Sequence, residues 1–287
     1  MEINHCVITI KQTIFARGGR AADFARSGDA TAIRLMKSDA EQQKTLAAVR
    51  QEMNRHKITF IEICAKDFSA AEKKLINKAD LVISVGGDGT ALGTSHYITH
   101  GALLGVNSAP GDSIGHFCHA NRSDFNIKFS QIINDQWKPS DIARLSVELD
   151  GEILPEHALN DVLIAHDCPA ATTRYIIQRG EQQEEHRSSG IWVCSPAGST
   201  AGIKSAGGKV MKLNSKQMQF YVRELYREPN REYFITNGFL EAGEILTVAS
   251  KMPEAHLYID GSRTSYKFLF GSRVRLQMAE SPLRLFL

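Results

Sequence analysis

The segment Gly86–Thr90, with the sequence Gly-Gly-Asp-Gly-Thr, places one acidic side chain inside a glycine-rich turn. It follows the apolar run Leu81–Val85, which is typical of a buried strand, and precedes a helix-like stretch. Glycines let backbone N–H groups approach an anion closely, and the N-terminus of a helix adds a favourable dipole. A carboxylate beside phosphate is useful where it holds a divalent cation or accepts a proton from an attacking hydroxyl. The segment therefore indicates phosphoryl transfer, with Asp88 as the candidate catalytic residue.

The same segment allows other interpretations. Asp88 could simply cap the helix that follows a tight turn. The glycines at 87, 89 and 93 loosely imitate the dinucleotide fingerprint of dehydrogenases, but the segment follows the third strand-like run, and the next strand ends at Val106-Asn107 without an acidic residue. The chain contains no G-x-x-x-x-G-K-[ST] phosphate loop.

A second polar pair, Asn160-Asp161, stands directly before the apolar run Val162–Ile164. An Asn side chain both donates and accepts hydrogen bonds and an ionised Asp only accepts, which suits two adjacent ribose hydroxyls. The same pair is also common in a plain turn before a strand, and this alternative stays open.

A third segment, Cys194–Gly208, consists mainly of small and hydroxyl side chains. Such residues cannot build a core, so the segment either packs against another element or cradles a ligand. A flexible linker is the alternative, but Pro196 restricts the backbone and no charged run extends the segment. We interpret it as a binding loop.

The elements that must position these residues alternate between strands and helices as far as residue 140. Capping boxes at Ser38–Glu41 and Ser69–Glu72 predict two helix starts. The predicted strands are Val7–Ile10, Ile58–Ile63, Leu81–Val85 and Leu103–Val106. This alternation predicts a doubly wound α/β domain with a parallel sheet over residues 1–140.

From residue 141 onward the pattern changes to short runs separated by turn residues, which predicts a mostly antiparallel all-β domain over residues 141–287. Asp150-Gly151 and Asp260-Gly261 both indicate hairpin turns. The charged stretch Gly180–Arg187 is interpreted as a solvated hairpin tip. The predicted strands are Ser146–Leu149, Glu152–Leu154, Arg174–Gln178, Ile191–Cys194, Phe220–Val222, Ile245–Ala249, His256–Ile259 and Val274–Met278.

Composition describes an ordinary globular protein: 43% of residues are hydrophobic, 23% are charged, and the net charge is +2. No basic cluster indicates a nucleic acid partner, and no apolar run is long enough to span a membrane. The five cysteines form no close pairs and the ten histidines show no ligand spacing, so neither a disulfide framework nor a protein-held metal site is expected. We expect a reducing, cytoplasmic location.

The three segments together, in this order, resemble the NAD kinase family, and the resemblance runs from about residue 45 to residue 260. Gly105–Ser108, Cys168–Ala171 and Ser205–Gly208 are similar to the plant and organellar NADH-kinase-like branch. The resemblance implies phosphorylation of the adenosine 2′-hydroxyl of NAD⁺ or NADH, with Asp88 as the general base. ATP with Mg²⁺ is the donor that the family usually uses, and other nucleotides or polyphosphate serve some members. The resemblance also implies dinucleotide contacts from Gly86, Gly87, Gly89, Thr90, Asn107, Asn160, Asp161, Arg187, Ser199, Thr200, Ala201 and Ser205.

The chain departs from the family pattern at two places near the nicotinamide end. Gly202 stands where many members carry a Tyr, and Arg187–Gly190 reads Arg-Ser-Ser-Gly in place of Arg-Gly-Asp-Gly. Ser189 therefore lacks the charge that would favour the positive ring of NAD⁺, and Gly202 would leave space beside the ring, so we expect NADH to be accepted at least comparably. The alternative is that Glu184 or Glu185 supplies the missing charge from the hairpin. The family pattern also implies a homodimer in which Gly180–Gly190 contributes to the neighbouring site.

Two other functions remain to be distinguished. A lipid kinase of the diacylglycerol type also carries a Gly-Gly-Asp-Gly loop, but it would not explain Asn160-Asp161 or the Ser199-Thr200 loop, and the chain lacks an amphipathic basic helix for membrane contact. A non-catalytic dinucleotide sensor would keep the glycines but would need no acid at position 88.

Overall fold

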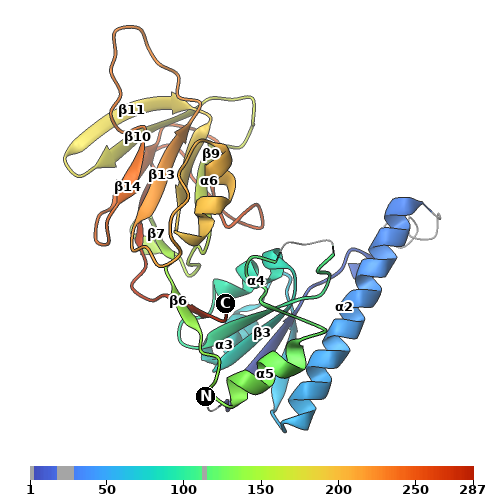
Figure 1. The fold of residues 1–287 in the computed structure, drawn as a ribbon. Helices are drawn as coiled ribbons and strands as arrows, with labels where there is room; N and C mark the ends of the chain where they lie inside the picture. Colours follow the sequence, from blue (N-terminus) through green and yellow to red (C-terminus); the bar gives the residue numbers. More distant parts are fainter. Residues whose placement is uncertain (1–2, 18–28, 112–114) are drawn as a thin grey trace. The chain divides into compact units, whose positions relative to one another are not determined.

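The computed structural model describes residues 3–17, 29–111 and 115–287. The chain forms two compact units, Met1–Asp141 together with Leu283–Leu287, and Ile142–Pro282 (Figure 1). In the described part of the chain, no helix is long and apolar enough to cross a membrane.

The first unit is a parallel sheet with helices on both faces. Its strands lie in the order β2 (Phe60–Cys64), β1 (Cys6–Ile10), β3 (Leu81–Gly86), β4 (Ala102–Asn107), β19 (Leu283–Leu285) and β6 (Ser140–Ile142), with the short β5 (Ala120–Asn121) beside β4. The pairs among β2, β1, β3, β4, β5 and β19 are all parallel. The helices are η1 (Phe15–Arg17), α2 (Ala30–Arg55), α3 (Ala70–Lys78), α4 (Asp88–Ser95) and α5 (Phe125–Ile133).

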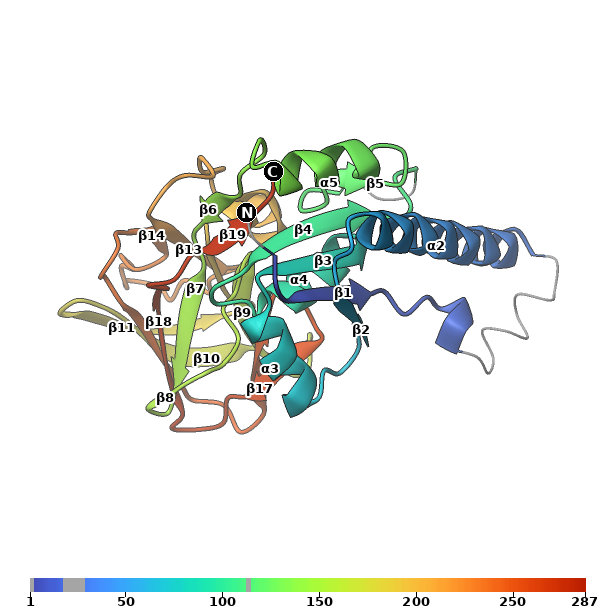
Figure 2. The same ribbon diagram turned by 90° about the horizontal axis from the view of Figure 1, so that it is seen from below.

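The two faces of this sheet are covered by different helices. Ile8 belongs to a buried cluster with Val49 of α2 and Phe129 of α5, and these two helices run side by side in Figures 1 and 2. The neighbouring Thr9 points to the other face, where its hydroxyl is 2.9 Å from the hydroxyl of Thr94 in α4. Because successive strand residues face opposite sides, this alternation confirms the doubly wound α/β fold.

One of the two predicted helix starts is wrong. α3 begins at the expected capping box, in which Ser69 Oγ accepts the Glu72 N–H and the Glu72 carboxylate accepts the Ser69 N–H. α2, however, begins eight residues before Ser38, capped by Asp29, whose carboxylate accepts the Thr31 N–H at 2.7 Å. The Ser38–Glu41 pattern lies inside the helix, because a capping box is a local signal that helical residues on both sides can override.

The second unit consists of two six-stranded antiparallel sheets. One sheet has the order β11 (Gln182–Ser188), β10 (Thr173–Arg179), β15 (Leu246–Ser250), β18 (Arg273–Met278), β7 (Leu145–Leu149) and β8 (Glu152–Ile153). The other has the order β14 (Asn237–Leu240), β13 (Met218–Arg223), β12 (Gly190–Cys194), β9 (Asp161–His166), β16 (Ala255–Ile259) and β17 (Thr264–Lys267). Alternate residues of both sheets, such as Tyr175, Val248, Ile191 and Phe220, form one buried core, which confirms the antiparallel β architecture.

Two segments of this half differ from the sequence analysis. Residues 182–188, predicted as part of a solvated tip, form β11, and its His186 is fully buried. The last five residues, assigned to the β domain, belong instead to the first unit, where Arg284 and Leu285 of β19 pair with Ala102 and Leu103 of β4. Burial of Leu283 and Leu285 stabilises this return of the chain to the first sheet.

Candidate functional site

Asp88 is the first residue of α4, at the carboxyl end of the central strand β3. Gly87 is the N-cap of the helix, and it makes no side-chain capping bond. The Asp88 carboxylate instead accepts two backbone N–H groups from a neighbouring segment, His116 at 2.9 Å and Phe117 at 2.8 Å. The interpretation of Asp88 as a helix N-cap is therefore wrong. Each carboxylate oxygen receives one of these backbone bonds, and the Cys118 thiol also hydrogen-bonds to the carboxylate.

Gly86, Thr90 and Asn107 form the wall of this turn. A Cβ on Gly86 would lie 2.5 Å from Thr90 Oγ1, so the close packing of Thr90 over the end of β3 requires glycine there. Gly86 is paired with Asn107 in the parallel register of β3 and β4, and its carbonyl accepts the Ser108 N–H at 2.9 Å. The predicted residues of the first segment are thus brought together at one edge of the sheet, with Gly89 exposed beside them.

Cys118 is a neighbour of Asp88 that sequence reasoning missed. Its thiol is buried, and burial together with the negative charge of Asp88 raises its pKa to about 12. The thiol therefore stays protonated at neutral pH and does not compete with Asp88 as a base. The contacts from His116, Phe117 and Cys118 left no sequence signal, because two of them use backbone N–H groups that every residue carries.

The second and third segments meet in the β-rich unit. The Ser195 N–H donates to the Asn160 carbonyl at 2.9 Å, and the Ser195 hydroxyl donates to the Leu159 carbonyl. A Cβ on Gly198 would lie only 1.9 Å from the Asn160 carbonyl oxygen, so the loop can approach the turn only with glycine at this position. The structure thus brings Asn160 and Asp161 against the start of the small-residue loop.

Asp161 lies at the start of β9 with 6% of its surface exposed. Burial, and then the charge of the nearby Asp260, raise its pKa to about 7. A carboxyl group with this pKa exists in both forms near neutral pH, so it can donate as well as accept a hydrogen bond.

The small-residue loop forms η2 (Ala197–Thr200) and α6 (Gly202–Ser205). Ser199 is fully buried: its hydroxyl donates to the Pro196 carbonyl at 2.7 Å and accepts the Met211 N–H at 2.9 Å. Its side chain therefore braces the loop. Thr200 and Ser205 are exposed and Ala201 is half-buried, which leaves these three residues accessible.

Gly202 does not leave the open space that the sequence analysis expected. A Cβ at Gly202 would lie 3.0 Å from Cζ2 of Trp192, and a Cβ at Gly207 would lie 2.6 Å from the hydroxyl of Tyr221. Trp192 and Tyr221 are paired across β12 and β13. Their neighbouring aromatic side chains therefore pack against the glycines at positions 202 and 207, where a larger residue would have its Cβ atom. Sequence reasoning missed Trp192, because its contact with residue 202 arises only after the strands pair.

Arg187 is the one predicted binding residue of this unit that lies apart from the others. It is an exposed residue of β11, and its carbonyl accepts the Tyr226 N–H at 2.8 Å. Arg187 precedes the Gly190 end of β12, whereas Asp161 pairs with Cys194 at the other end of that strand. Within one copy of the β-rich unit, Arg187 is not part of the cluster around Asn160.

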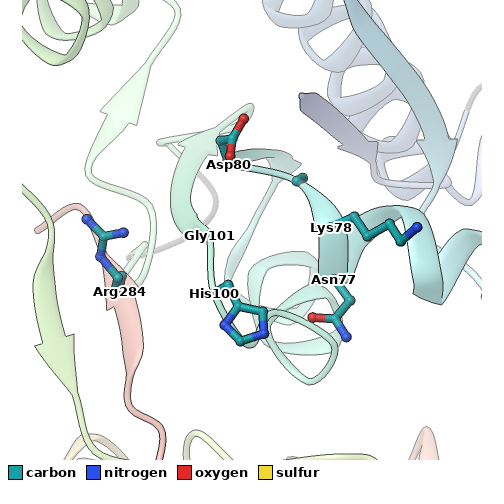
Figure 3. Close-up of a pocket in the computed structure, with 7 residues that line it drawn as sticks. Asn77, Lys78, Asp80, His100, Gly101 and Arg284 are labelled. Atoms are coloured by element: carbon teal, nitrogen blue, oxygen red, sulfur yellow. The ribbon is translucent and has the colours of Figure 1, made fainter. Parts of the chain in front are cut away.

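A cavity of about 400 Å³ lies at the opposite edge of the first sheet, where β3 and β4 begin (Figure 3). Residues that line it include Asn77, Lys78, Asp80, His100, Gly101 and Arg284. No predicted site residue lines it. Among residues 3–17, 29–111 and 115–287, no three His, Cys, Asp or Glu side chains are grouped as a protein metal site would require.

Comparison with known proteins agrees with this arrangement. The family model described as "ATP-NAD kinase N-terminal domain" matches residues 25–136. A probable NADH kinase from Oryza sativa subsp. japonica is 32% identical over 263 residues, which cover 84% of this chain and 79% of the rice protein. The chain belongs to the NAD kinase family. Another member of the NAD kinase family, the NADH kinase of Arabidopsis thaliana, is 33% identical over 74% of both chains.

The fold of this NAD kinase family member also matches a solved structure. The crystal structure of an NAD kinase from Archaeoglobus fulgidus in complex with ATP has a TM-score of 0.70, covers 99% of this chain and 93% of its own, and is 17% identical. At this identity the similarity shows a shared fold, an α/β unit followed by an antiparallel β unit. It is the fold predicted from the sequence.

Proposed function

We propose that this chain transfers the terminal phosphoryl group of ATP to the adenosine 2′-hydroxyl of NAD(H), giving NADP(H). The observation that carries this proposal is the Asp88 carboxylate, fixed by two backbone N–H groups at the start of α4 and beside a glycine-rich turn. The family membership supports the same reaction, because the relatives from rice and Arabidopsis are called NADH kinases and the archaeal structure contains ATP.

Asp88 acts as the general base in this reaction. Its fixed carboxylate accepts the proton of the 2′-hydroxyl as that oxygen attacks the phosphorus, and the terminal phosphoryl group leaves ADP. Gly86, Gly87, Gly89 and Thr90 form the turn that receives the phosphates, and Asn107 stands beside it. Mg²⁺ enters with ATP as part of the substrate and neutralises charge on the phosphates.

The acceptor dinucleotide binds through the residues clustered in the β-rich unit. Asn160 and Asp161 bind ribose hydroxyls, since they combine donors and acceptors on adjacent residues. Thr200, Ala201 and Ser205 line the site through accessible positions on the small-residue loop, while Ser199 holds that loop in shape. Arg187 reaches a dinucleotide only in a dimer in which it serves the neighbouring subunit's site.

NADH is proposed to be accepted at least comparably with NAD⁺. A carboxylate near the nicotinamide would favour the positive ring of NAD⁺, and Ser189 supplies none. The acidic residues closest along the chain, Glu184 and Glu185, are engaged elsewhere: Glu184 accepts the backbone N–H groups of Phe234 and Ile235, and Glu185 binds the Lys251 ammonium at 2.6 Å. The names of the rice and Arabidopsis relatives support the same preference.

A homodimer formed through the β-rich unit and a cytoplasmic location complete the proposal. All five cysteines are free thiols, as a reducing compartment would leave them.

One assay separates the candidate functions. The purified protein is incubated with Mg·ATP and, in parallel, with NAD⁺, NADH or diacylglycerol, and the products are identified by mass. We expect the mass of one added phosphoryl group on the dinucleotides and none on the lipid. Phosphorylation of the lipid alone would show a lipid kinase, and binding of dinucleotide without any product would show a sensor.

A further inference from the structure

Asp260, which the sequence identified only as a hairpin residue, accepts three consecutive backbone N–H groups. They belong to Leu159 at 2.8 Å, Asn160 at 2.7 Å and Asp161 at 3.0 Å. In return, the Asp260 N–H donates to the Asp161 carbonyl at 2.9 Å. Asp260 follows β16 and has a left-handed φ of 50°, the conformation that turns its side chain back over the start of β9.

This carboxylate fixes one side of the turn and Ser195 fixes the other. Hydrogen bonds to an ionised acceptor are about twice as strong as neutral ones. Three successive backbone N–H groups that point at one carboxylate form an anion-binding site for it. The carbonyls of Leu159 and Asn160 are taken by the hydroxyl and the N–H of Ser195. The backbone of residues 159–161 is therefore held on both sides, and this sets the direction of the Asn160 and Asp161 side chains.

A buried cation, Arg144, interacts electrostatically with Asp260. Arg144 has no exposed surface, and its Nη2 donates to the carbonyls of Ser281 at 3.1 Å and Pro282 at 3.4 Å. Burial lowers the pKa of this guanidinium to about 10, while the negative charge of Asp260 opposes the change. Arg144 thus stays charged at neutral pH, and the negative charge of Asp260 favours this charged form.

We propose that Asp260 is a positioning residue for acceptor binding, which fixes the backbone of the Asn160–Asp161 turn and places a second carboxylate near Asp161. The inference rests on the proposed function, because it assigns Asn160 and Asp161 to the dinucleotide. Asp260 acts through these two residues, and it is not itself assigned a contact with the substrate.

The charge of Asp260 also affects the pKa of Asp161, which a purely structural residue would not do. The titratable groups that interact with Asp161 in the described residues are Asp260 and Cys194, and the thiol of Cys194 stays protonated because burial and Asp161 raise its pKa to about 12. Removing the charge of Asp260 therefore lowers the pKa of Asp161. The pH at which dinucleotide affinity responds to the titration of Asp161 must then move downward.

The test is Asp260→Asn, compared with the wild-type protein in two measurements. The first is steady-state kinetics with each substrate varied, and the second is calorimetric binding of NADH between pH 5.5 and 8.5. We expect the KM for the dinucleotide to rise about tenfold or more, because one acceptor and the charge are lost, while the KM for ATP changes less than about twofold. We also expect the midpoint of the pH dependence of binding to fall.

Asp150→Asn is the matched control. Asp150 also has a left-handed φ, of 52°, also precedes a glycine, and its carboxylate also accepts a backbone N–H, that of Arg273 at 2.6 Å. It lies in the turn between β7 and β8 and makes no bond to residues 159–161. The control should keep the wild-type KM and the wild-type pH midpoint.

Two further variants test the inference if Asp260→Asn does not fold. Arg144→Met combined with Asp260→Asn removes the buried cation together with the charge of Asp260, so no unbalanced cation remains, and it should show the same rise in KM and the same fall in midpoint. Asp260→Glu keeps the charge but displaces it, so the KM should rise without a fall in midpoint. A folded variant lacking the Asp260 carboxylate that keeps the KM and midpoint of Asp150→Asn overturns the inference. A wild-type protein that phosphorylates neither NAD⁺ nor NADH overturns the proposed function instead.

Discussion

At the scale of single residues, Asp88 is held by backbone groups, and this determines what its replacement should do. In Asp88→Asn the amide keeps one acceptor for Phe117 but turns an NH₂ group toward the His116 N–H. We expect the unit to stay folded and turnover with NAD⁺ and Mg·ATP to fall by about 10²–10⁴-fold, the usual contribution of a general base. Rate measurements under saturating substrate, with circular dichroism to check folding, decide the outcome.

Asp80→Asn is the control for this prediction. Asp80 also accepts two backbone N–H groups, from Asn4 and His5 at 2.9 Å each, but it lies at the opposite end of β3 (Figure 3). This variant should keep its turnover. If Asp88→Asn turns over as fast as Asp80→Asn, Asp88 is not the base.

The absence of a charge at Ser189 gives a second prediction at this scale. A carboxylate near the nicotinamide would favour NAD⁺ over NADH by about 1 kcal/mol at a surface-like dielectric, or about fivefold. We expect the wild-type kcat/KM values for the two acceptors to be similar, and Ser189→Asp to shift the ratio toward NAD⁺. Ser189→Asn, of similar size but neutral, should leave the ratio unchanged. A wild-type preference for NAD⁺ above about tenfold would contradict the charge argument.

At the scale of elements, the contact between η2 and the turn before β9 is the tightest in the proposed acceptor site. The methyl group of Gly198→Ala would lie 1.9 Å from a backbone carbonyl, so the loop or the turn must move. We expect Gly198→Ala to lose at least about 2 kcal/mol of stability and most of its dinucleotide binding. Gly93→Ala, in the helix α4 with no atom within 4 Å of the added methyl group, should keep binding and stability. Scanning calorimetry with and without NADH would show whether the two variants differ.

The hairpin β10–β11 is tied to the segment around Phe234 by one carboxylate. Burial alone would raise the pKa of Glu184, but hydrogen bonds from His186, Phe234 and Ile235 outweigh it and lower the pKa. A lowered pKa stabilises the folded state above the ordinary pKa of about 4.3, and this stability is lost as the pH falls further. We expect Glu184→Gln to be less stable than wild type to denaturant at pH 7, with the difference shrinking at pH 3.5. The exposed Glu181, changed to Gln, should show no such difference at either pH.

Elements with a strong periodic pattern were predictable, and those held by partners distant in sequence were not. β3 and β4 are entirely buried, and their apolar runs were found in the sequence. β11 has polar or charged residues throughout, so nothing marks it as a strand until it pairs with β10. β19 has only three residues, and its partner β4 lies far away in sequence. Local patterns carry no information about such pairings.

The same limit applies to the site. The sequence identified Asp88, Asn160 and Asp161 from their residue types and spacing. It did not show the contact between the Asn160 turn and the small-residue loop, because neither segment alone predicts that contact. Asp260 was found as a turn residue because Asp-Gly has a strong local signature. Its second role depends on residues about 100 positions earlier in the chain, which no local pattern connects.

At the scale of the whole molecule, the proposed dimer is expected to form beside β11. β11 is an edge strand of its sheet, and the segment beside it is fixed by bonds from Tyr226 to Arg187 and from Phe234 to Glu184. Tyr226 is 56% exposed and Phe234 is 70% exposed. Exposed aromatic side chains are enriched in protein interfaces, because each of them buries a large area on association.

We therefore expect the protein to sediment as a dimer, and Phe234→Asp to weaken the dimer at least about tenfold, since a charge would be buried at the contact. Phe270→Asp is the matched control: Phe270 is 72% exposed but lies in the turn before β18. It should leave the sedimentation coefficient unchanged. Because Arg187 is proposed to serve the neighbouring site, the Phe234 variant should also lose activity at low protein concentration and recover it at high concentration. A wild-type protein that is monomeric and fully active at the assay concentration would contradict both the dimer and the shared site.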